Sequence, residues 1–275
     1  MRRRRLNTLT ILALGTLVVL TFAYMLPIYV MLVASLKTPL EISQRRYLVP
    51  SSHLHFENYT QAFTLVRQAL VNSTIISFAV TLLAAFFGSL GGYWLSRSRS
   101  TFAKVLFILV GIALYLPYQV VLIPLVQIMA KTRLALTHLG LILSYLILNM
   151  PLASVLMGTF FLSMPRELEE AAEVDGANKL QTFFYVITPM ALPAYASTAI
   201  IIFTQVWNEF LLALTLSTPK TTTIQVKLAE VKGSFVALYN IQMAAALISV
   251  IIPLLFFLAL GRYFIRGILA GALKG

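Results

Sequence analysis

Six long runs without a charged residue divide this sequence, and they restrict its possible folds more than any other feature. Each run exceeds the roughly 20 apolar residues that a helix needs to cross about 30 Å of hydrocarbon. With 59% hydrophobic and 11% charged residues, the composition excludes an ordinary soluble domain. The sequence therefore predicts an all-α membrane protein with six transmembrane helices. The runs are 6–36, 68–96, 105–130, 134–165, 180–208 and 233–261.

The first run follows the sequence MRRRR, which is also how a cleavable signal peptide begins. Its apolar part is about twice the usual length of such a peptide, and no small-x-small cleavage site closes it. We therefore expect a retained first span within one transmembrane domain over residues 1–275. The expected spans are about 9–36, 70–95, 105–130, 138–162, 190–216 and 243–265.

The distribution of Lys and Arg predicts the orientation in the membrane. With the arginines at 2–5 inside the cell, the inner segments carry more Lys and Arg than the outer ones. Six spans then place both termini in the cytoplasm, together with the segment 163–189. Topology explains the net charge of +12 more simply than nucleic-acid binding does. The predicted location is the cell (inner or plasma) membrane.

The stretch 163–193 is polar and holds more than half of the nine acidic residues. Its pattern predicts two short helices joined by a turn at Asp175-Gly176, where Gly176 is free to adopt a positive φ. In the second helix, Leu180, Phe183, Phe184 and Ile187 have the spacing of one helical face. This periodicity fits either an amphipathic helix at the membrane surface or a docking element for a partner.

The same stretch carries a specific motif. Glu170-Ala171-Ala172 is followed by three residues, Gly176, nine residues and the tetrapeptide 186–189. This resembles the signature loop of ABC importer permeases, EAA-x3-G-x9-I-x-L-P, with Val186 in place of Ile and Thr188 in place of Leu. Other short segments of the sequence are similar to those of carbohydrate-uptake permeases of the maltose type. The matching segments are Asn72-Ser73, 123–125, 207–210 and 266–275.

The resemblance implies the type I ABC importer permease fold, with cytoplasmic coupling helices in 163–189 that sit in a cleft of an ATPase. It implies that the C-terminal tail lies in the seam between two ATPase subunits. The implied ATPase-coupling residues are Glu170, Ala171, Ala172, Asp175, Gly176, Phe183 and Pro189. The implied tail residues are Gly271, Ala272, Leu273, Lys274 and Gly275.

The resemblance also implies the partners of this chain. They are a second homologous permease, an ATPase homodimer or heterodimer, an external solute-binding protein and membrane lipid, with no nucleic acid. The sequence has no GxxxxGK[ST] motif, so ATP and Mg are expected in the partner ATPase, and we expect neither a cofactor nor an enzymatic activity in this chain. It has no cysteine, and its three histidines do not form a metal site by spacing.

A sugar site requires aromatic faces for the ring and amides for the hydroxyl groups. The candidates for the substrate pathway are Tyr118, Gln119, Asn149, Gln205 and Asn208, and Tyr115, Gln127, Tyr145 and Trp207 have the same character. Each of them also fits an interface aromatic or an interhelical hydrogen bond. The expected solute is a sugar or related small carbohydrate, and a polyol, a glycerophosphodiester or a glycosidic compatible solute remains open.

Two rival classes depend on the acidic residues. A secondary transporter requires titratable groups at mid-membrane, but Glu209, the only acid within a span, lies about 30 Å along span five. We expect Glu209 to have a structural partner such as Lys220, or a packing role. A membrane enzyme would require the acids of 167–175, whose EAA spacing favours docking. The outer loop 218–242 contains TTTIQVKL, which reads as strand-like, and by itself fits a solvated loop. The resemblance to maltose-type permeases implies that this loop contacts the external solute-binding protein.

Overall fold

The computed structural model describes residues 8–44, 46–232 and 238–272, and every regular element in these ranges is a helix. The chain forms two compact units. One contains the residues up to Arg67 together with Leu228–Val250, and the other contains Gln68–Lys227 and the residues from Ile251 onward. The long helices α3 (Glu57–Arg97) and α13 (Tyr239–Ala272) each run through both units.

The first unit begins with α1 (Thr8–Ser35), whose apolar side chains are exposed over most of its length, as suits a helix surrounded by lipid. The short helix α2 (Pro39–Ser43) starts with a capping box, in which Thr38 and Glu41 satisfy each other's backbone amides. Ser51 donates a hydrogen bond of 2.6 Å to the Glu41 carboxylate. This bond, with the Thr38 amide, lowers the pKa of Glu41 from 4.5 to about 2.

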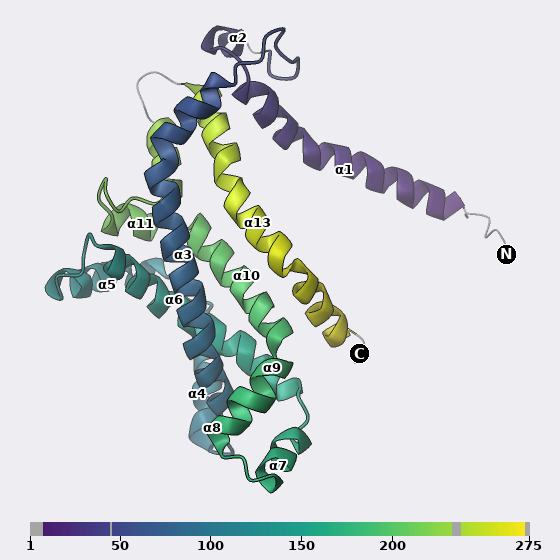
Figure 1. The fold of residues 1–275 in the computed structure, drawn as a ribbon, viewed down its shortest axis with the longest axis vertical. Coiled ribbons are helices and arrows are strands. Elements are labelled where there is room, and N and C mark those ends of the chain that lie inside the picture. The colour runs from purple at the N-terminus through teal and green to yellow at the C-terminus, as the bar shows by residue number, and fades with distance from the viewer. Residues whose placement is uncertain (1–7, 45, 233–237, 273–275) are drawn as a thin grey trace. The chain divides into compact units, whose positions relative to one another are not determined.

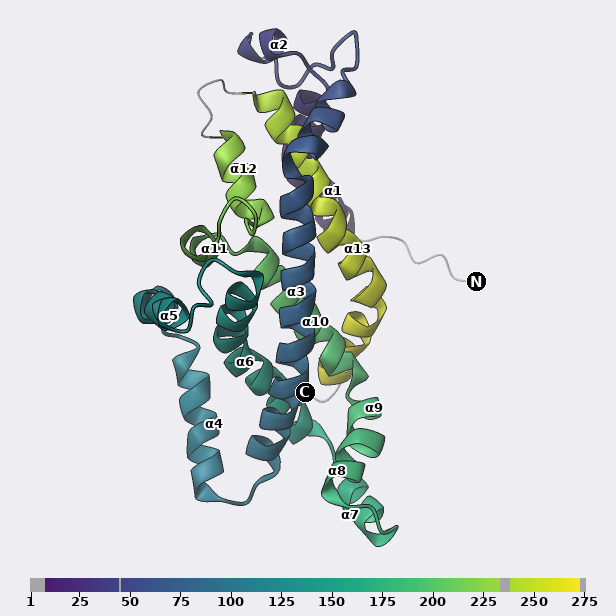
Figure 2. The same ribbon diagram turned by 60° about the vertical axis from the view of Figure 1, so that its left-hand side comes forward.

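The core of the second unit consists of α3, α6 (His138–Ser163) and α10 (Leu192–Asn208), which lie side by side in both views (Figures 1 and 2). Helices α3 and α6 approach closely at two glycines. A Cβ atom at Gly88 would lie 2.4 Å from the Cβ of Ala153, and one at Gly92 would lie 2.5 Å from the Ser154 carbonyl oxygen. These small residues therefore allow close helix contact, as they do in other membrane helices.

The third expected span, 105–130, is two short helices. Helix α4 (Thr101–Ala113) ends before residues 114–118, and α5 (Gln119–Lys131) follows in a different direction (Figure 2). Pro117 lies in this break, where its ring nitrogen has no hydrogen to donate to a continuing helix. The expected single helix is therefore replaced by a helix–turn–helix segment.

Four helices among the described residues are long and apolar enough to cross a membrane: α1, α3, α6 and α13. A fifth span results if the helical segment Lys179–Met190 and α10 count as one, although the chain bends by 76° between them. The number of six spans therefore stays a prediction.

The expectation of a strand-like piece at TTTIQVKL is wrong. The chain from Ile224 to Lys232 is a helix, α12, and the threonines before it are irregular and buried. The Asn72 side-chain amide donates to the carbonyl oxygens of Lys220 and Thr222, and the Ile224 amide donates to Ser73 Oγ. Polar side chains of α3 therefore satisfy the backbone of this segment, and this tertiary contact outweighs the β propensity of threonine.

Candidate functional site

The polar stretch 163–190 folds as the sequence predicts, into two helical pieces joined by a turn. The first piece is α7 (Glu167–Val174), and the second comprises α8 (Lys179–Gln181), η1 (Thr182–Ile187) and α9 (Thr188–Met190). We call residues 163–190 the coupling segment. In both views α7 lies at the same end of its unit as the C-terminal end of α3 (Figures 1 and 2).

Gly176 makes the turn of the coupling segment possible. Its φ is +87°, a value that side-chain-bearing residues rarely adopt. The amide of Ala177 donates to the Ala172 carbonyl oxygen at 2.9 Å, which closes the end of α7. On the other side of the turn, Asn178 and Gln181 form a capping box that starts α8. The predicted role of Gly176 as the turn residue is confirmed.

The predicted apolar face of the second piece is only half buried. Phe183 and Ile187 are buried, whereas Leu180 and Phe184 are exposed. Residues 182–187 form a π-helical turn, which contains more residues than an α-helical turn. A spacing of four residues therefore aligns side chains here better than a spacing of three, and the face narrows to Phe183 and Ile187.

Two contacts attach the coupling segment to the helices of its own chain. The ring of Phe183 lies 5.0 Å from that of Tyr93 on α3 and 6.3 Å from that of Phe161 on α6, measured between centroids. The Arg97 guanidinium at the end of α3 forms a 2.6 Å ion pair with Glu169 of α7 and donates to the Met164 carbonyl oxygen at 3.0 Å. Both halves of the segment are thereby held against α3.

The residues expected to couple to an ATPase differ in exposure. Glu170, Ala171, Asp175, Gly176 and Pro189 are exposed at the surface of this chain. Ala172 and Phe183 are buried within it. The exposed group is open to a second protein, whereas the buried pair packs inside the chain. In the expected tail, Gly271 and Ala272 end α13, and Leu273, Lys274 and Gly275 lie outside the described residues.

A second polar site lies at the junction between α10 and α11 (Leu211–Leu216). The Glu209 carboxylate accepts hydrogen bonds from the Tyr118 hydroxyl at 2.9 Å and from the Tyr145 hydroxyl at 2.7 Å. It also accepts from the backbone amides of Leu212 at 2.8 Å and Ala213 at 3.2 Å, which are free donors at the start of α11. We call this group the Glu209 cluster.

Glu209 has structural partners, as expected, but they are two tyrosines and the start of α11 rather than Lys220. An acid two residues before the apolar helix LLALTL is a sequence signal for such a cap, since helix N-termini favour negative charge. The two tyrosines are distant in sequence, 91 and 64 residues from Glu209, and no local pattern identifies them.

Three of the five substrate-pathway candidates lie at or beside the Glu209 cluster. Tyr118 belongs to it, Asn149 is buried and donates to the Tyr145 carbonyl oxygen, and Asn208 precedes Glu209 and accepts from Gln225. Gln119 and Gln205 have exposed side chains. The structure thus gives Asn149 and Asn208 partners within the chain and leaves the two glutamines open to ligands.

Comparison with known proteins identifies the family. The model of the family "binding-protein-dependent transport system inner membrane component" matches residues 82–270, more than half of the chain. The chain belongs to this family. The permease is therefore a multi-pass membrane component of a binding-protein-dependent transport system, and its family role is transport rather than catalysis.

Relatives of the permease cover nearly its whole length. It is 34% identical over 262 residues to the glucose import system permease protein GlcU of Saccharolobus solfataricus, covering 92% of this chain and 91% of the relative. It is 31% identical to the melibiose/raffinose/stachyose import permease protein MelC of Bacillus subtilis, covering 100% of both. The family assignment therefore applies to the chain as a whole.

A solved structure resembles the permease over its full length. The structure is of a bacterial ABC transporter involved in the import of the acidic polysaccharide alginate. The TM-score is 0.81 at 21% sequence identity, with 96% of this chain and 99% of that chain covered. The permease thus has the type I ABC importer fold predicted from its signature motif.

Proposed function

We propose that this permease imports a sugar or a related small carbohydrate, driven by ATP hydrolysis in a separate subunit. The observation that carries the proposal is the full-length similarity to the glucose import permease, supported by the full-length similarity to the melibiose/raffinose/stachyose import permease. A further relative, a probable starch degradation products permease of Thermoanaerobacterium thermosulfurigenes, is 29% identical and belongs to the same substrate class.

The proposed complex contains a second homologous permease, an ATPase homodimer or heterodimer and an external solute-binding protein, embedded in membrane lipid. Both termini and the coupling segment lie in the cytoplasm in this arrangement, which the excess of Lys and Arg in the inner segments supports. ATP and Mg bind the ATPase, and the permease itself holds no cofactor.

The coupling segment supplies the proposed mechanism. Closure of the ATPase dimer around ATP pulls the exposed surface of α7 and the turn at Gly176. The ion pair between Arg97 and Glu169 and the ring contact between Phe183 and Tyr93 pass this movement to α3. The spans then change from an inward-facing to an outward-facing arrangement, and hydrolysis resets them.

In the proposed translocation pathway, Gln119 and Gln205 offer exposed amides to the hydroxyl groups of the solute. Tyr118, Asn149 and Asn208 shape the same pathway through the Glu209 cluster and its neighbours. The tail residues from Gly271 onward are proposed to reach the ATPase seam. Deleting residues 268–275 should then lower uptake while membrane insertion stays intact.

A glycosidic compatible solute is the second candidate. The permease is 36% identical over 209 residues to the osmoprotective compounds uptake permease protein GgtD of Synechocystis, covering 75% of this chain and 70% of that protein. A sulfoquinovosyl glycerol transport permease of Agrobacterium fabrum is 29% identical. Both candidates share a sugar ring with free hydroxyl groups, so the same mechanism serves either.

The test is purification of the tagged permease from its native membrane in mild detergent, followed by reconstitution of the recovered complex. We expect an ATPase with a GxxxxGK[ST] motif and a second permease to copurify. ATP-dependent uptake of glucose, melibiose or a glycosylated glycerol into the vesicles would then identify the solute class. A permease that came out alone and moved solute without ATP would overturn the proposal in favour of a secondary transporter.

A further inference from the structure

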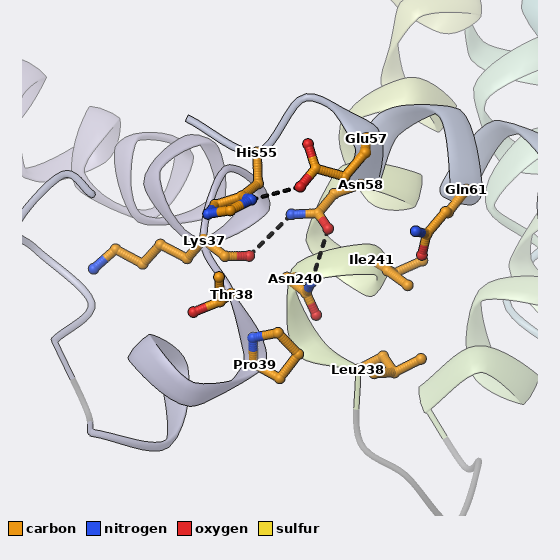
Figure 3. A pocket seen from close by; sticks show the side chains of 10 residues that line it. All are labelled: Lys37, Thr38, Pro39, His55, Glu57, Asn58, Gln61, Leu238, Asn240 and Ile241. Atoms are coloured by element: carbon orange, nitrogen blue, oxygen red, sulfur yellow. Dashed lines mark hydrogen bonds and ion pairs between the residues drawn. The ribbon is translucent and has the colours of Figure 1, made fainter. Parts of the chain in front are cut away.

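The loop after α1, residues 36–56, begins and ends at the same place on that helix. The Asn58 side-chain nitrogen donates to the Lys37 carbonyl oxygen at 2.9 Å (Figure 3). The His55 amide donates to the Leu36 carbonyl oxygen at 3.1 Å. Both ends of the loop are therefore held at the end of α1, and the question is where the chain between them goes.

Two polar side chains from α1 and its end bind the middle of this loop. The Tyr29 hydroxyl donates to the Leu48 carbonyl oxygen at 2.9 Å, and the Lys37 ammonium group donates to the Arg46 carbonyl oxygen. Figure 3 shows the Lys37 side chain extending away from Asn58. The later residue of the loop thus meets the earlier residue of the helix. The segment therefore runs antiparallel to α1, back along its last turns.

The tip of the loop carries exposed apolar side chains. The chain bends at Leu48 and Val49, and Ser51 then donates to the Glu41 carboxylate of α2 at 2.6 Å, which brings the chain back toward its base. Leu48 is 56% exposed and Val49 is 62% exposed, and Tyr47 before them is exposed as well. The farthest point of the loop along α1 is thus also an apolar one.

This tip lies beside an exposed, apolar part of α1. Near Tyr29, the side chains of Leu26, Ile28 and Leu32 are about half exposed. Helix α1 is long and apolar enough to cross a membrane, and an exposed apolar surface on such a helix faces lipid. The tip extends this surface. Its irregular backbone excludes a place in the hydrocarbon itself, where amides find no water, so the tip belongs at the level of the lipid head groups.

The order of residue types in the tip matches the layers of a membrane surface. Arg46 and Tyr47 are exposed and precede the two aliphatic residues. At a membrane surface, basic side chains pair with lipid phosphates, tyrosine rings lie among the head groups, and aliphatic side chains reach the acyl boundary. The sequence has no Asp or Glu from 42 to 56, so no acid in this segment repels an anionic head group.

We infer that residues 46–49 are a lipid anchor, which lies in the head-group layer where α1 leaves the membrane. Arg46 lies beside lipid phosphates, and Leu48 and Val49 lie at the edge of the acyl chains. The anchor fixes the depth of the end of α1 in the bilayer. The inference requires the membrane location that the family assignment establishes, and it depends neither on the solute nor on the orientation of the chain.

The experiment is EPR of single spin labels, which the absence of cysteine from this chain makes simple. Val49→Cys labels the tip, and Ser52→Cys labels an exposed polar neighbour as the matched control. Leu20→Cys, exposed on α1, is the lipid reference. The permease and the proteins that copurify with it are reconstituted in vesicles of phosphatidylcholine and phosphatidylglycerol in equal amounts, without binding protein or ATP. The signal of the labelled complex without an introduced cysteine is subtracted.

The two collision reagents are oxygen, which dissolves in lipid, and the Ni(II) complex of EDDA, which stays in water. We expect the nickel complex to reach the label at position 49 about fivefold to tenfold less than the label at position 52, while oxygen reaches it at least as well. Equal access of nickel to both positions would place the tip in water and overturn the inference. Exclusion of both reagents from position 49 would show a protein cover and would overturn it as well.

A second variant tests the placement of the tip along α1. Tyr29→Phe removes the hydroxyl that holds Leu48 and keeps the ring, so in the Val49→Cys permease it should raise nickel access about twofold to threefold. Tyr24→Phe, which alters another exposed tyrosine of α1, should leave access unchanged. If the two variants behaved alike, Tyr29 would not hold the tip and the placement would be wrong. Because no measurement here uses turnover, its failure leaves the proposed import function untouched.

Discussion

The coupling segment and the Glu209 cluster are both places where acidic residues interrupt apolar helices, yet the structure uses the acids in opposite ways. In the coupling segment, Glu170 and Asp175 are exposed on α7 and the turn. At the junction of α10 and α11, Glu209 accepts four hydrogen bonds from its own chain. The first arrangement leaves charged groups at the surface, and the second uses a charged group to hold the chain together.

Helix α7 contains both cases in two adjacent residues, Glu169 and Glu170. The Glu169 carboxylate pairs with Arg97, while that of Glu170 faces outward. An acidic cluster in a sequence is therefore a mixture of internal and external roles, and the helical position of each residue decides which role it has.

The largest expected effect comes from removing the internal acid. Glu209→Ala leaves two tyrosine hydroxyls and two backbone amides without their acceptor, and should lower the free energy of unfolding by about 3 kcal/mol. Thermal unfolding in detergent measures the change. Glu209→Gln, which keeps an acceptor oxygen, should retain part of the stability; identical melting of all three proteins would contradict the role of the cluster.

Neighbouring glutamates in α7 separate the two roles directly. Glu169→Ala leaves the largely buried Arg97 unpaired and should destabilise the docking of α7 by about 2 kcal/mol. Glu170→Ala removes only an exposed group and should leave stability within about 0.5 kcal/mol. Hydrogen exchange of the α7 amides measures the stability of α7 docking in both variants, and ATP-driven uptake shows whether the exposed Glu170 is needed for transport.

If Glu170→Ala, rather than Glu169→Ala, proved to loosen α7, the assignment of internal and external roles would be reversed. A loss of uptake with unchanged α7 protection in Glu170→Ala is the pattern that supports a partner-facing role.

Gly176→Val tests the turn that presents the external acids. A β-branched residue at φ +87° costs about 1–2 kcal/mol and should displace α7 from its docking position. Uptake should fall about tenfold, with the level of inserted protein unchanged. Gly176→Asn is the matched control, since asparagine tolerates this conformation better. Full uptake by the valine variant would show that the turn geometry is dispensable.

Tyr118→Phe is a milder test of the Glu209 cluster. It removes one of four donors and keeps the ring, so the expected loss is about 1 kcal/mol. Tyr145→Phe should cost somewhat more, because Tyr145 is only 1% exposed and its hydrogen bond is shorter. Thermal unfolding of the two single variants and the double variant measures whether the two hydroxyls act independently.

The smallest effect concerns Glu41, an acid that is half-buried and satisfied within its own chain. Its folded pKa of about 2 lies below the ordinary value of 4.5, so its contribution to stability is present above pH 4.5 and is lost as the pH falls toward 2. Hydrogen exchange in the peptide 38–44 should accelerate over this range, after correction for intrinsic rates. Glu41→Gln should remove the pH dependence, and an unchanged profile would exclude Glu41 as its source.

The sequence predicted those features of the fold that depend on residues close together in the chain. The turn at Gly176 and the two pieces of the coupling segment both follow from residue type and spacing. The sequence motif also predicted the family. These features depend on backbone conformation or on side-chain size, both of which can be read from a few consecutive residues.

Features that depend on distant residues were not predictable. Tyr118 and Tyr145 reach Glu209 across 91 and 64 residues, and Arg97 had no sequence signal beyond its charge. The helix in place of the strand-like segment 221–228 results from Asn72 and Ser73 on α3, far earlier in the chain. The π-helical turn at 182–187 narrowed an apolar face that regular α periodicity had overestimated.

The glycine contact between α3 and α6 has a consequence for the transport cycle. At Gly88 and Gly92 the two backbones touch with no side chain between them that could change rotamer. If α3 slid along α6, main-chain atoms would collide. The two helices are therefore expected to move together as one rigid body. In the proposed transport cycle, relative movement of the helices is then expected at contacts between larger side chains, such as the stacked rings of Phe203 and Phe256, whose centroids lie 4.2 Å apart. The smallest residues of the unit thus determine which of its surfaces stay fixed while the others move.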